Sequence, residues 1–493
     1  MKIYAIVQSL IVKAIECNLI KLDDEIYARN QILSLLKLDS FQLEEELINE
    51  QIPDLLDKIE VYACEEGIIN DLTDERDILI NKIMNCFMDK PSIVNDKFFQ
   101  AYGKDPKEAT DYFYKLSRDN NYIQTKRIAK NIQYKVLTEY GELDITINLS
   151  KPEKNPKDIA AQKNIKSLNY PKCLLCNENE GYVGRIGHPA RANHRIIPMT
   201  LENEKWFMQY SPYVYYNEHC IVLSEEHRDM KIHRDSFTKL LEFVEKFPHY
   251  FLGSNADLPI VGGSILSHDH YQGGNYEFAM TKAENEYSFK LEKFKNTGFA
   301  IIKWPMSVLR LRSMDKRELA EAADYVLNKW RNYSDESVNV IAYSNEIPHN
   351  TVTPIGRIKN DIFEIDLVLR NNRTTKQYPS GIFHPHEDVH HIKKENIGLI
   401  EVMGLAVLPA RLKTEIIEIE KYLLNQDNQI EDYHKPWAKE LKFMYLDRVN
   451  RDNINLIIRK EVGMKFLRVL EDSGVFKRDE DGRGAFRRFI STL

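Results

Sequence analysis

Residues able to do chemistry gather in one short stretch, where His268, His270 and Gln272 occupy every second position. Side chains alternate along an extended strand, so all three would face the same side. An imidazole can attack phosphorus when one ring nitrogen is unprotonated and the other is held; for His270 we expect a backbone carbonyl near its predecessor as that partner. Alternate histidines are equally typical of zinc or iron ligands. A phosphorus nucleophile and a metal site remain equal alternatives for this row.

A second pattern is the pair Cys173 and Cys176, two thiols three positions apart in a stretch typical of a loop. This spacing lets two thiolates bind one tetrahedral zinc ion. A redox pair has the same spacing, but no helix-start pattern surrounds Leu174 to support that reading. A zinc site would need two further ligands.

A third stretch is dense in hydrogen-bond donors and includes Arg191, Asn193 and Arg195. Guanidinium groups match the geometry of phosphate oxygens, so we expect part of this stretch to contact the phosphates of a nucleotide or a sugar. A charged surface loop remains the alternative for each single residue.

The row His268-Asp269-His270-Tyr271-Gln272 resembles the His-x-His-x-Gln motif of galactose-1-phosphate uridylyltransferases, which belong to the histidine-triad superfamily. The wider sequence resembles the second, largely bacterial class of that family, from about Asn120 onward. Asp269 and Tyr271 stand where the first class has proline and glycine, and they leave the row intact. The supporting blocks are residues 173–181, 188–195, 211–220 and 378–409.

The resemblance implies an activity in galactose metabolism: UDP-glucose and galactose 1-phosphate give glucose 1-phosphate and UDP-galactose. His270 would attack the α-phosphorus and form a uridylyl-histidine intermediate. Gln272, Ser264 and Gly273 would hold the phosphoryl oxygens, and Asn217 resembles the position near the uridine ribose and phosphates. The implied fold is α+β, with two related histidine-triad-like halves built of antiparallel sheets and packed helices.

The resemblance also implies structural metal sites. By position, His227 and His268 match the third and fourth ligands of a structural zinc ion that Cys173 and Cys176 would share. A second structural metal is left open, because Glu277 and Glu286 compete with Glu284 for its carboxylate position. The best matches to that second site are Glu284, His349, His384 and His386.

Composition limits the classes of function. The chain has 493 residues, of which 43% are hydrophobic and 29% charged, enough for a large core in two or three domains. With 68 basic and 75 acidic residues the formal charge is −7, so a basic surface for nucleic acid is not indicated. Six scattered cysteines and the lack of a long apolar run favour a reduced cytoplasmic setting without a membrane span.

The elements that must position the row fall into three predicted domains. Residues 1–120 show helical periodicity throughout and are interpreted as a module that packs on the catalytic part or helps it form a homodimer. Residues 121–295 would form the catalytic half, and residues 296–493 the second half. The clearest predicted elements are a strand at 143–149, helices at 316–330 and 395–407, and strands at 299–303, 338–343 and 362–369.

Two rival functions remain on the sequence alone. A histidine-triad nucleotide phosphorylase or adenylyltransferase would use the same row with an adenine nucleotide. A metal-dependent hydrolase would bind a catalytic metal at both His268 and His270, and would form no covalent nucleotide intermediate.

Overall fold

The computed structural model describes residues 2–150, 157–158, 161, 168–263, 265–446 and 448–493. The chain forms two compact units. Unit 1 comprises Met1–Lys130 and Ser150–Arg228, and unit 2 comprises Asn131–Leu149 and Asp229–Leu493. Both units contain helices and mainly antiparallel strands, which confirms the predicted α+β class. Within the described ranges, no helix is both long enough and apolar enough to cross a bilayer.

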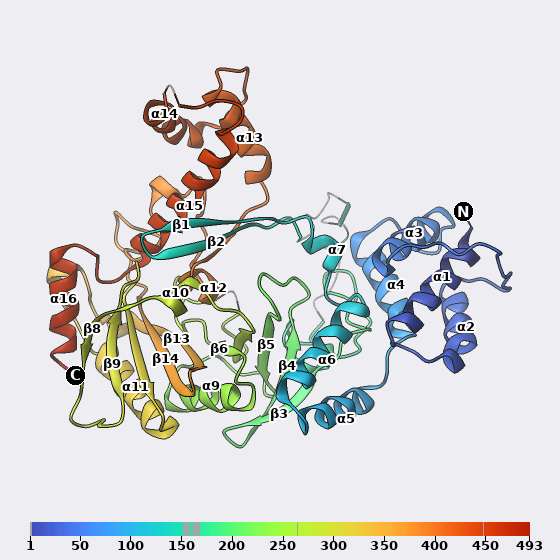
Figure 1. Ribbon diagram of the computed structural model, residues 1–493, viewed down its shortest axis with the longest axis horizontal. Coiled ribbons are helices and arrows are strands. Elements are labelled where there is room, and N and C mark those ends of the chain that lie inside the picture. Colours follow the sequence, from blue (N-terminus) through green and yellow to red (C-terminus); the bar gives the residue numbers. More distant parts are fainter. Residues whose placement is uncertain (1, 151–156, 159–160, 162–167, 264, 447) are drawn as a thin grey trace. The chain divides into compact units, whose positions relative to one another are not determined.

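Unit 1 begins with the predicted helical segment, drawn in blue in Figure 1. Proline occupies the first turn of three of its helices, where a missing N–H costs nothing. The apolar stripes expected from the sequence meet in one core, with Leu10, Leu55 and Ile59 fully buried. The helices are α1 (Ile3–Glu16), α2 (Glu25–Leu35), α3 (Ile52–Glu65), α4 (Thr73–Asn85), α5 (Pro91–Tyr102), α6 (Pro106–Asp119) and α7 (Thr125–Ile128), with a 3-10 turn η1 (Leu22–Asp24).

Three antiparallel strands complete unit 1: β3 (Ile197–Leu201), β4 (Glu204–Tyr210) and β5 (Cys220–Ser224), preceded by the turn η2 (Asn177–Asn179). Glu202 and Asn203 both have a positive φ, as a two-residue hairpin connection requires. The ring of Phe113 on α6 lies 5.2 Å from that of Tyr210 on β4. The helical segment therefore packs on the strands of its own unit.

Unit 2 contains a mainly antiparallel sheet in the order β7-β6-β13-β14-β10-β9-β8. One face of it is covered by α9 (Arg234–Lys246) and α11 (Lys316–Arg331), around a core that includes Leu309, Leu367 and Trp330 (Figure 1). The strands are β6 (Phe251–Gly253), β7 (His270–Gly274), β8 (Asn285–Phe289), β9 (Gly298–Ile302), β10 (Val308–Ser313), β13 (Asn350–Lys359) and β14 (Ile362–Asn371).

The same sheet carries a buried charge network on strands β10, β13 and β14. Arg310 donates two hydrogen bonds to Asp366, at 2.7 and 2.9 Å, and Arg357 donates a third at 2.5 Å. Glu364 accepts from Arg357 and from Arg312. Arg310 also donates to two carbonyl oxygens at the helix α10 (Ala279–Lys282), which follows β7. The network therefore holds the segment after β7 against the sheet.

A separate small sheet joins distant parts of unit 2. Strands β1 (Ile132–Thr138) and β2 (Gly141–Ile147) form a hairpin, and β15 (Leu405–Leu408) pairs with β2 in parallel. Helix α15 (Ile454–Ser473) packs on β1 (Figure 1). The remaining elements are α12 (Leu399–Val402), α13 (Leu412–Leu423), α14 (Lys435–Met444), α16 (Glu480–Ile490), β11 (Tyr343–Ser344), β12 (Ile347–Pro348), η3 (Glu336–Val338), η4 (Glu387–Val389) and η5 (Asp432–His434).

Two predicted elements are wrong. The helix expected over 395–407 is reduced to α12, because Gly404 takes a left-handed φ of 106° and the following residues leave the helix to pair with β2. In the range 338–343, where a strand was expected, Val338 ends a 3-10 turn, Asn339 has a φ of 61°, and only Tyr343 belongs to a strand, the short β11. The other predicted elements are confirmed, with α11 and β14 close to their expected bounds.

Candidate active site

The reactive row lies where β7 begins. His268 precedes the strand, and His270 and Gln272 are on it. Strand β7 pairs with β6, and Gln272 is paired to Gly253. His268 is fully buried and His270 is 6% exposed. The expected period of two therefore holds for His270 and Gln272, while His268 lies at the entrance to the strand.

The His270 ring is oriented by the backbone. Its Nδ1 lies 2.7 Å from the carbonyl oxygen of His268. A carbonyl can only accept, so Nδ1 carries the hydrogen, and Nε2 of the neutral ring keeps its lone pair. Burial lowers the pKa of His270 to about 4, although the His268 carbonyl acts in the opposite direction. This is the partner that the sequence predicted, and it leaves the lone pair of the ring on Nε2.

The other residues expected to hold phosphoryl oxygens stay predictions. Gln272 is half-buried on β7, and Gly273 is buried beside it. Ser264 lies outside the described residues.

Three of the predicted zinc ligands gather within unit 1. The sulfur atoms of Cys173 and Cys176 are 3.5 Å apart, and the Cys176 sulfur lies 3.2 Å from Nδ1 of His227. Their ligand atoms all lie within 4.8 Å of one another. Two thiols and an imidazole are the donors that zinc prefers, so the cluster is compatible with a metal ion.

The second proposed metal group stays a prediction. In the described part of the chain, no group of three or more potential ligands contains Glu284, His349, His384 or His386. The histidines are engaged elsewhere: His349 with Asn372, His384 with Asn396, and His386 with the Ile382 carbonyl and Asp472.

Two of the predicted phosphate contacts are occupied by structural hydrogen bonds. Asn193 is 1% exposed and exchanges side-chain to carbonyl hydrogen bonds with Asn120, at 2.8 and 3.0 Å. The Arg195 guanidinium donates to the carbonyl oxygens of Asp89, Ala192 and His194. Both side chains therefore tie the loop to the helical segment, and their contact with substrate stays a prediction.

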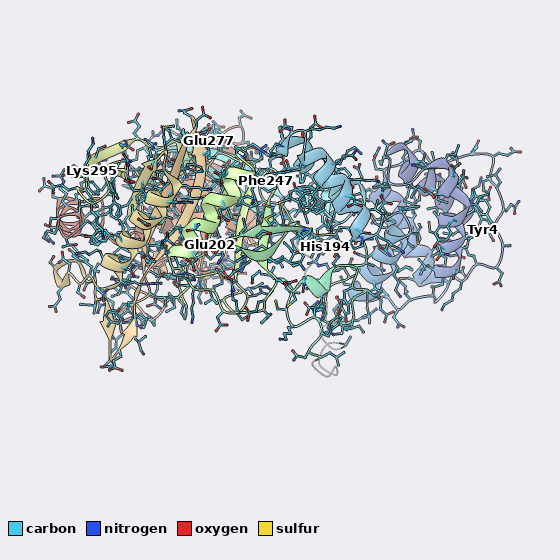
Figure 2. The ribbon with its side chains drawn as sticks, turned by 90° about the horizontal axis from the view of Figure 1, so that it is seen from below. Tyr4, His194, Glu202, Phe247, Glu277 and Lys295 are labelled. Atoms are coloured by element: carbon cyan, nitrogen blue, oxygen red, sulfur yellow. The ribbon has the colours of Figure 1, made fainter. Side chains whose placement is uncertain are left out.

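Other donors of this part of unit 1 differ in their surroundings. His194, labelled in Figure 2, is 1% exposed and stacks on Tyr122 with 4.3 Å between ring centres. Asn217 is exposed and donates to Glu218 at 2.9 Å. The guanidinium of Arg191 also lies over the Tyr122 ring, 5.3 Å from its centroid. Contact of Arg191 and Asn217 with substrate stays a prediction.

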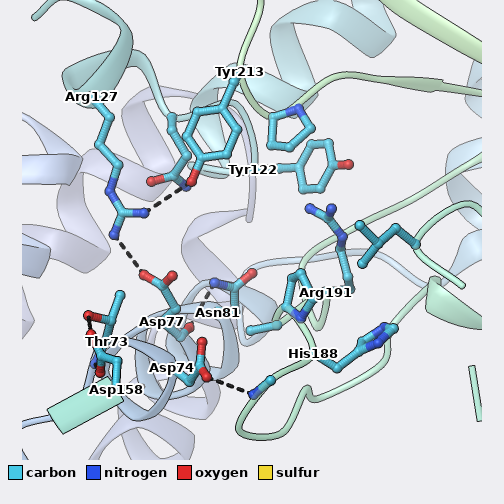
Figure 3. Close-up of a pocket in the computed structure, with 16 residues that line it drawn as sticks. Thr73, Asp74, Asp77, Asn81, Tyr122, Arg127, Asp158, His188, Arg191 and Tyr213 are labelled. Atoms are coloured by element: carbon cyan, nitrogen blue, oxygen red, sulfur yellow. Dashed lines mark hydrogen bonds and ion pairs between the residues drawn. The ribbon is translucent and has the colours of Figure 1, made fainter. Parts of the chain in front are cut away.

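Sequence reasoning missed the residues with which Arg191 shares a cavity. Asp74 and Asp77 of α4 and Arg127 of α7 line it, together with Tyr122 and Tyr213 (Figure 3). The spacing of the two aspartates is also that of an ordinary solvated helix face, so the sequence offered no signal.

The chain matches known proteins along nearly all of its length. Residues 18–229 match the family described as galactose-1-phosphate uridyl transferase, N-terminal domain, and residues 242–439 match its C-terminal domain. A galactose-1-phosphate uridylyltransferase of Fusobacterium nucleatum subsp. nucleatum is 54% identical, over 100% of this chain and 99% of that protein. One of Clostridium acetobutylicum is 52% identical, over 99% of both chains. A solved yeast Ap4A phosphorylase Apa2 is 12% identical over 61% of this chain and 88% of that chain, with a TM-score of 0.34, too low to bear on the activity.

The two family matches define a nucleotidyl-transferring enzyme, and a strand-borne histidine whose Nδ1 is held by a backbone carbonyl is compatible with that class. The chain belongs to the galactose-1-phosphate uridylyltransferase family.

Proposed function

We propose that this protein transfers a uridylyl group between hexose 1-phosphates, converting UDP-glucose and galactose 1-phosphate into glucose 1-phosphate and UDP-galactose. The full-length relatives carry the name of this activity. The observation that carries the proposal is the His270 ring, held through Nδ1 by the His268 carbonyl so that Nε2 is available. The cytoplasm stays the expected compartment.

The reaction proceeds by double displacement. Nε2 of His270 attacks the α-phosphorus of UDP-glucose, and the bond from that phosphorus to the bridging oxygen breaks. Glucose 1-phosphate leaves, and the uridylyl group remains on the ring. A phosphate oxygen of galactose 1-phosphate then attacks the same phosphorus, and the nitrogen–phosphorus bond breaks. Leaving group and attacking group are both phosphates that are ionised near neutral pH, so the chain needs no strong general acid.

Gln272 and the amide of Gly273 would stabilise the charge that develops on the phosphoryl oxygens. Arg191, Asn193, Arg195, Asn217 and Ser264 remain the proposed contacts to the rest of the substrates.

A zinc ion is proposed at Cys173, Cys176, His227 and His268, and these donor types fit it. Four protein ligands leave no open position, so bound zinc would supply structural support rather than chemistry. For the chain itself, the consequence is that His268 would be fixed by its side chain while its carbonyl orients His270.

The test is to incubate the protein with UDP-glucose labelled in the uridylyl group and to map the label by peptide analysis. We expect the label on the peptide that contains His270, and none after His270→Asn. Gln272→Ala should slow formation of the labelled enzyme by about 10² to 10³, as expected for one lost oxyanion donor. Absence of label, its placement on another residue, or equal labelling from ATP would overturn the proposal.

A further inference from the structure

A short segment of unit 2, residues 397–399, lies against the strand that flanks the reactive row. The Leu399 side chain occupies the space above Gly253 of β6, because a Cβ at that glycine would lie 2.8 Å from Leu399 Cδ1. Gly253 is paired with Gln272 of β7. Directly paired residues of an antiparallel ladder have their side chains on the same face. Leu399 therefore lies on the face of the sheet toward which Gln272 points.

The same segment reaches the loop before the row through Asn255. The backbone N–H of Leu399 donates to Oδ1 of Asn255 at 2.9 Å. The Asn255 side chain also lies against Gly263, where a Cβ would be 2.6 Å from its Nδ2. Continuing the register of β6 and β7 by two residues places Asn255, which is 5% exposed, level with His270. A shift of the 397–399 segment would therefore displace both the loop and the flanking strand.

A buried arginine fixes the first residue of this segment. Arg370 of β14 is 1% exposed, and two N–H groups of its guanidinium donate to the carbonyl oxygen of Ile397, both at 3.1 Å. Among the described residues this carbonyl is the only hydrogen-bond acceptor of the side chain, and its Nε has no partner there. Burial lowers the pKa of Arg370 to about 10, while the nearby Glu401 carboxylate raises it, so the group is a cation at neutral pH.

A cation in this position is costly for the fold, because a buried guanidinium is normally hydrogen-bonded to a carboxylate. The Glu401 carboxylate instead accepts from Lys393 and from the backbone N–H of Gly398, each at 3.1 Å. What Arg370 provides is geometry, since two donors of a rigid fork converge on one oxygen and fix the direction of that carbonyl. Supporting contacts of this kind are expected where the placement of reactive groups matters.

We propose that Arg370 is a positioning residue for uridylyl transfer. It fixes the 397–399 segment, and this segment holds β6 and Asn255 beside the row. The inference rests on the proposed function of His270. Because small displacements of a nucleophile change its rate of attack steeply, loss of Arg370 should slow the transfer step more than it weakens substrate binding.

The test measures the rate constant of a single turnover, in which the full chain is labelled by UDP-glucose carrying the label in the uridylyl group, at several concentrations. Arg370→Met keeps an apolar stem without donors or charge. Its rate constant at saturation should fall by about tenfold or more, and the half-saturating concentration should change by less than about threefold. Arg370→Lys keeps the charge and should restore part of the rate. A purely structural role would lower the labelled fraction and leave the rate constant unchanged.

Trp304→Phe is the matched control. Trp304 is also fully buried, and its Nε1 donates to the carbonyl oxygen of Val402, at the other end of α12, at 2.9 Å. This variant should lower the midpoint of thermal unfolding and leave the rate constant within about twofold of the original. If Arg370→Met does not fold, Leu399→Ala takes its place, because it removes the contact with Gly253 while Arg370 is retained, and it should slow the same step.

Three results would overturn the inference and leave the proposed function intact. They are an unchanged rate constant in Arg370→Met, or in Leu399→Ala where that variant takes its place, an equal fall in Trp304→Phe, and a change confined to the half-saturating concentration. An original protein that takes up no label would overturn both.

Discussion

Neutralising Asp366 tests the buried charge network of unit 2. The carboxylate is fully buried and accepts three hydrogen bonds from Arg310 and Arg357. Burial alone would raise the pKa of Asp366, yet the two guanidinium groups bring it down to about 2. Asp366→Asn would leave three arginines sharing Glu364. Breaking a buried ion pair by removing one partner typically costs 3–5 kcal/mol, and we expect a loss of about that size in the free energy of unfolding.

The assay is thermal unfolding, combined with hydrogen exchange of the β14 peptide. A loss of about 3 kcal/mol or more corresponds to a midpoint lower by roughly 6 °C or more for a unit of this size. Arg312→Ala is the control, because this side chain pairs with Glu364 but is 40% exposed, and a pair open to solvent contributes about 1 kcal/mol or less. If Asp366→Asn were no more destabilising than Arg312→Ala, the network would not stabilise the unit as argued.

Three further outcomes are expected. Cys173→Ser should lower the zinc content measured by metal analysis, and unchanged zinc would remove this thiol from the site. Gly463→Ala should destabilise the fold by roughly 1–3 kcal/mol in thermal unfolding, because a Cβ there would lie 2.5 Å from the Val136 side chain. Gly484→Ala in α16 should be neutral or stabilising, because a Cβ there would meet only Nη1 of Arg488, at an ordinary contact distance of 3.7 Å. Burial, and to a lesser extent the neighbouring His434, lower the pKa of His391 to about 3. Between pH 6.5 and 3 the unfolded chain therefore binds a proton at His391 that the folded chain does not, so the free energy of unfolding should fall as the pH drops through this range. His391→Leu should flatten this pH dependence.

The sequence predicted elements best where their signal is local. The helices of unit 1 carry apolar residues at helical spacing, such as Leu55 and Ile59 of α3, and this spacing alone defines the face that is buried. The helix expected over 395–407 fails for a non-local reason. Residues 405–408 have a partner strand 261 positions earlier in the chain, and the parallel pairing with β2 outweighs their helical periodicity.

The same distinction between local and non-local signals applies to the residues of the candidate site. The orientation of His270 follows from the carbonyl two residues earlier, so it could be predicted from the motif. The hydrogen bonds of Asn193 and Arg195 within the protein could not be predicted, because their partners Asn120 and Asp89 are contributed by a distant helical segment. A donor-rich loop looks the same in sequence whether its donors face a phosphate or the carbonyl oxygens of the same protein. Only the fold distinguishes the two.

The hydrogen bonds that Asn193 and Arg195 make have a consequence for shortening the chain. A fragment that began near Asn120 would keep every residue of the histidine row, yet it would lose Asp89 and Asn85, to which the Arg195 guanidinium donates. That cation would then be exposed or left without two of its acceptors, and leaving a buried donor unsatisfied typically costs about 1–3 kcal/mol, more when the group is charged. The amino-terminal helices are thus part of the scaffold that any minimal version of this enzyme must retain.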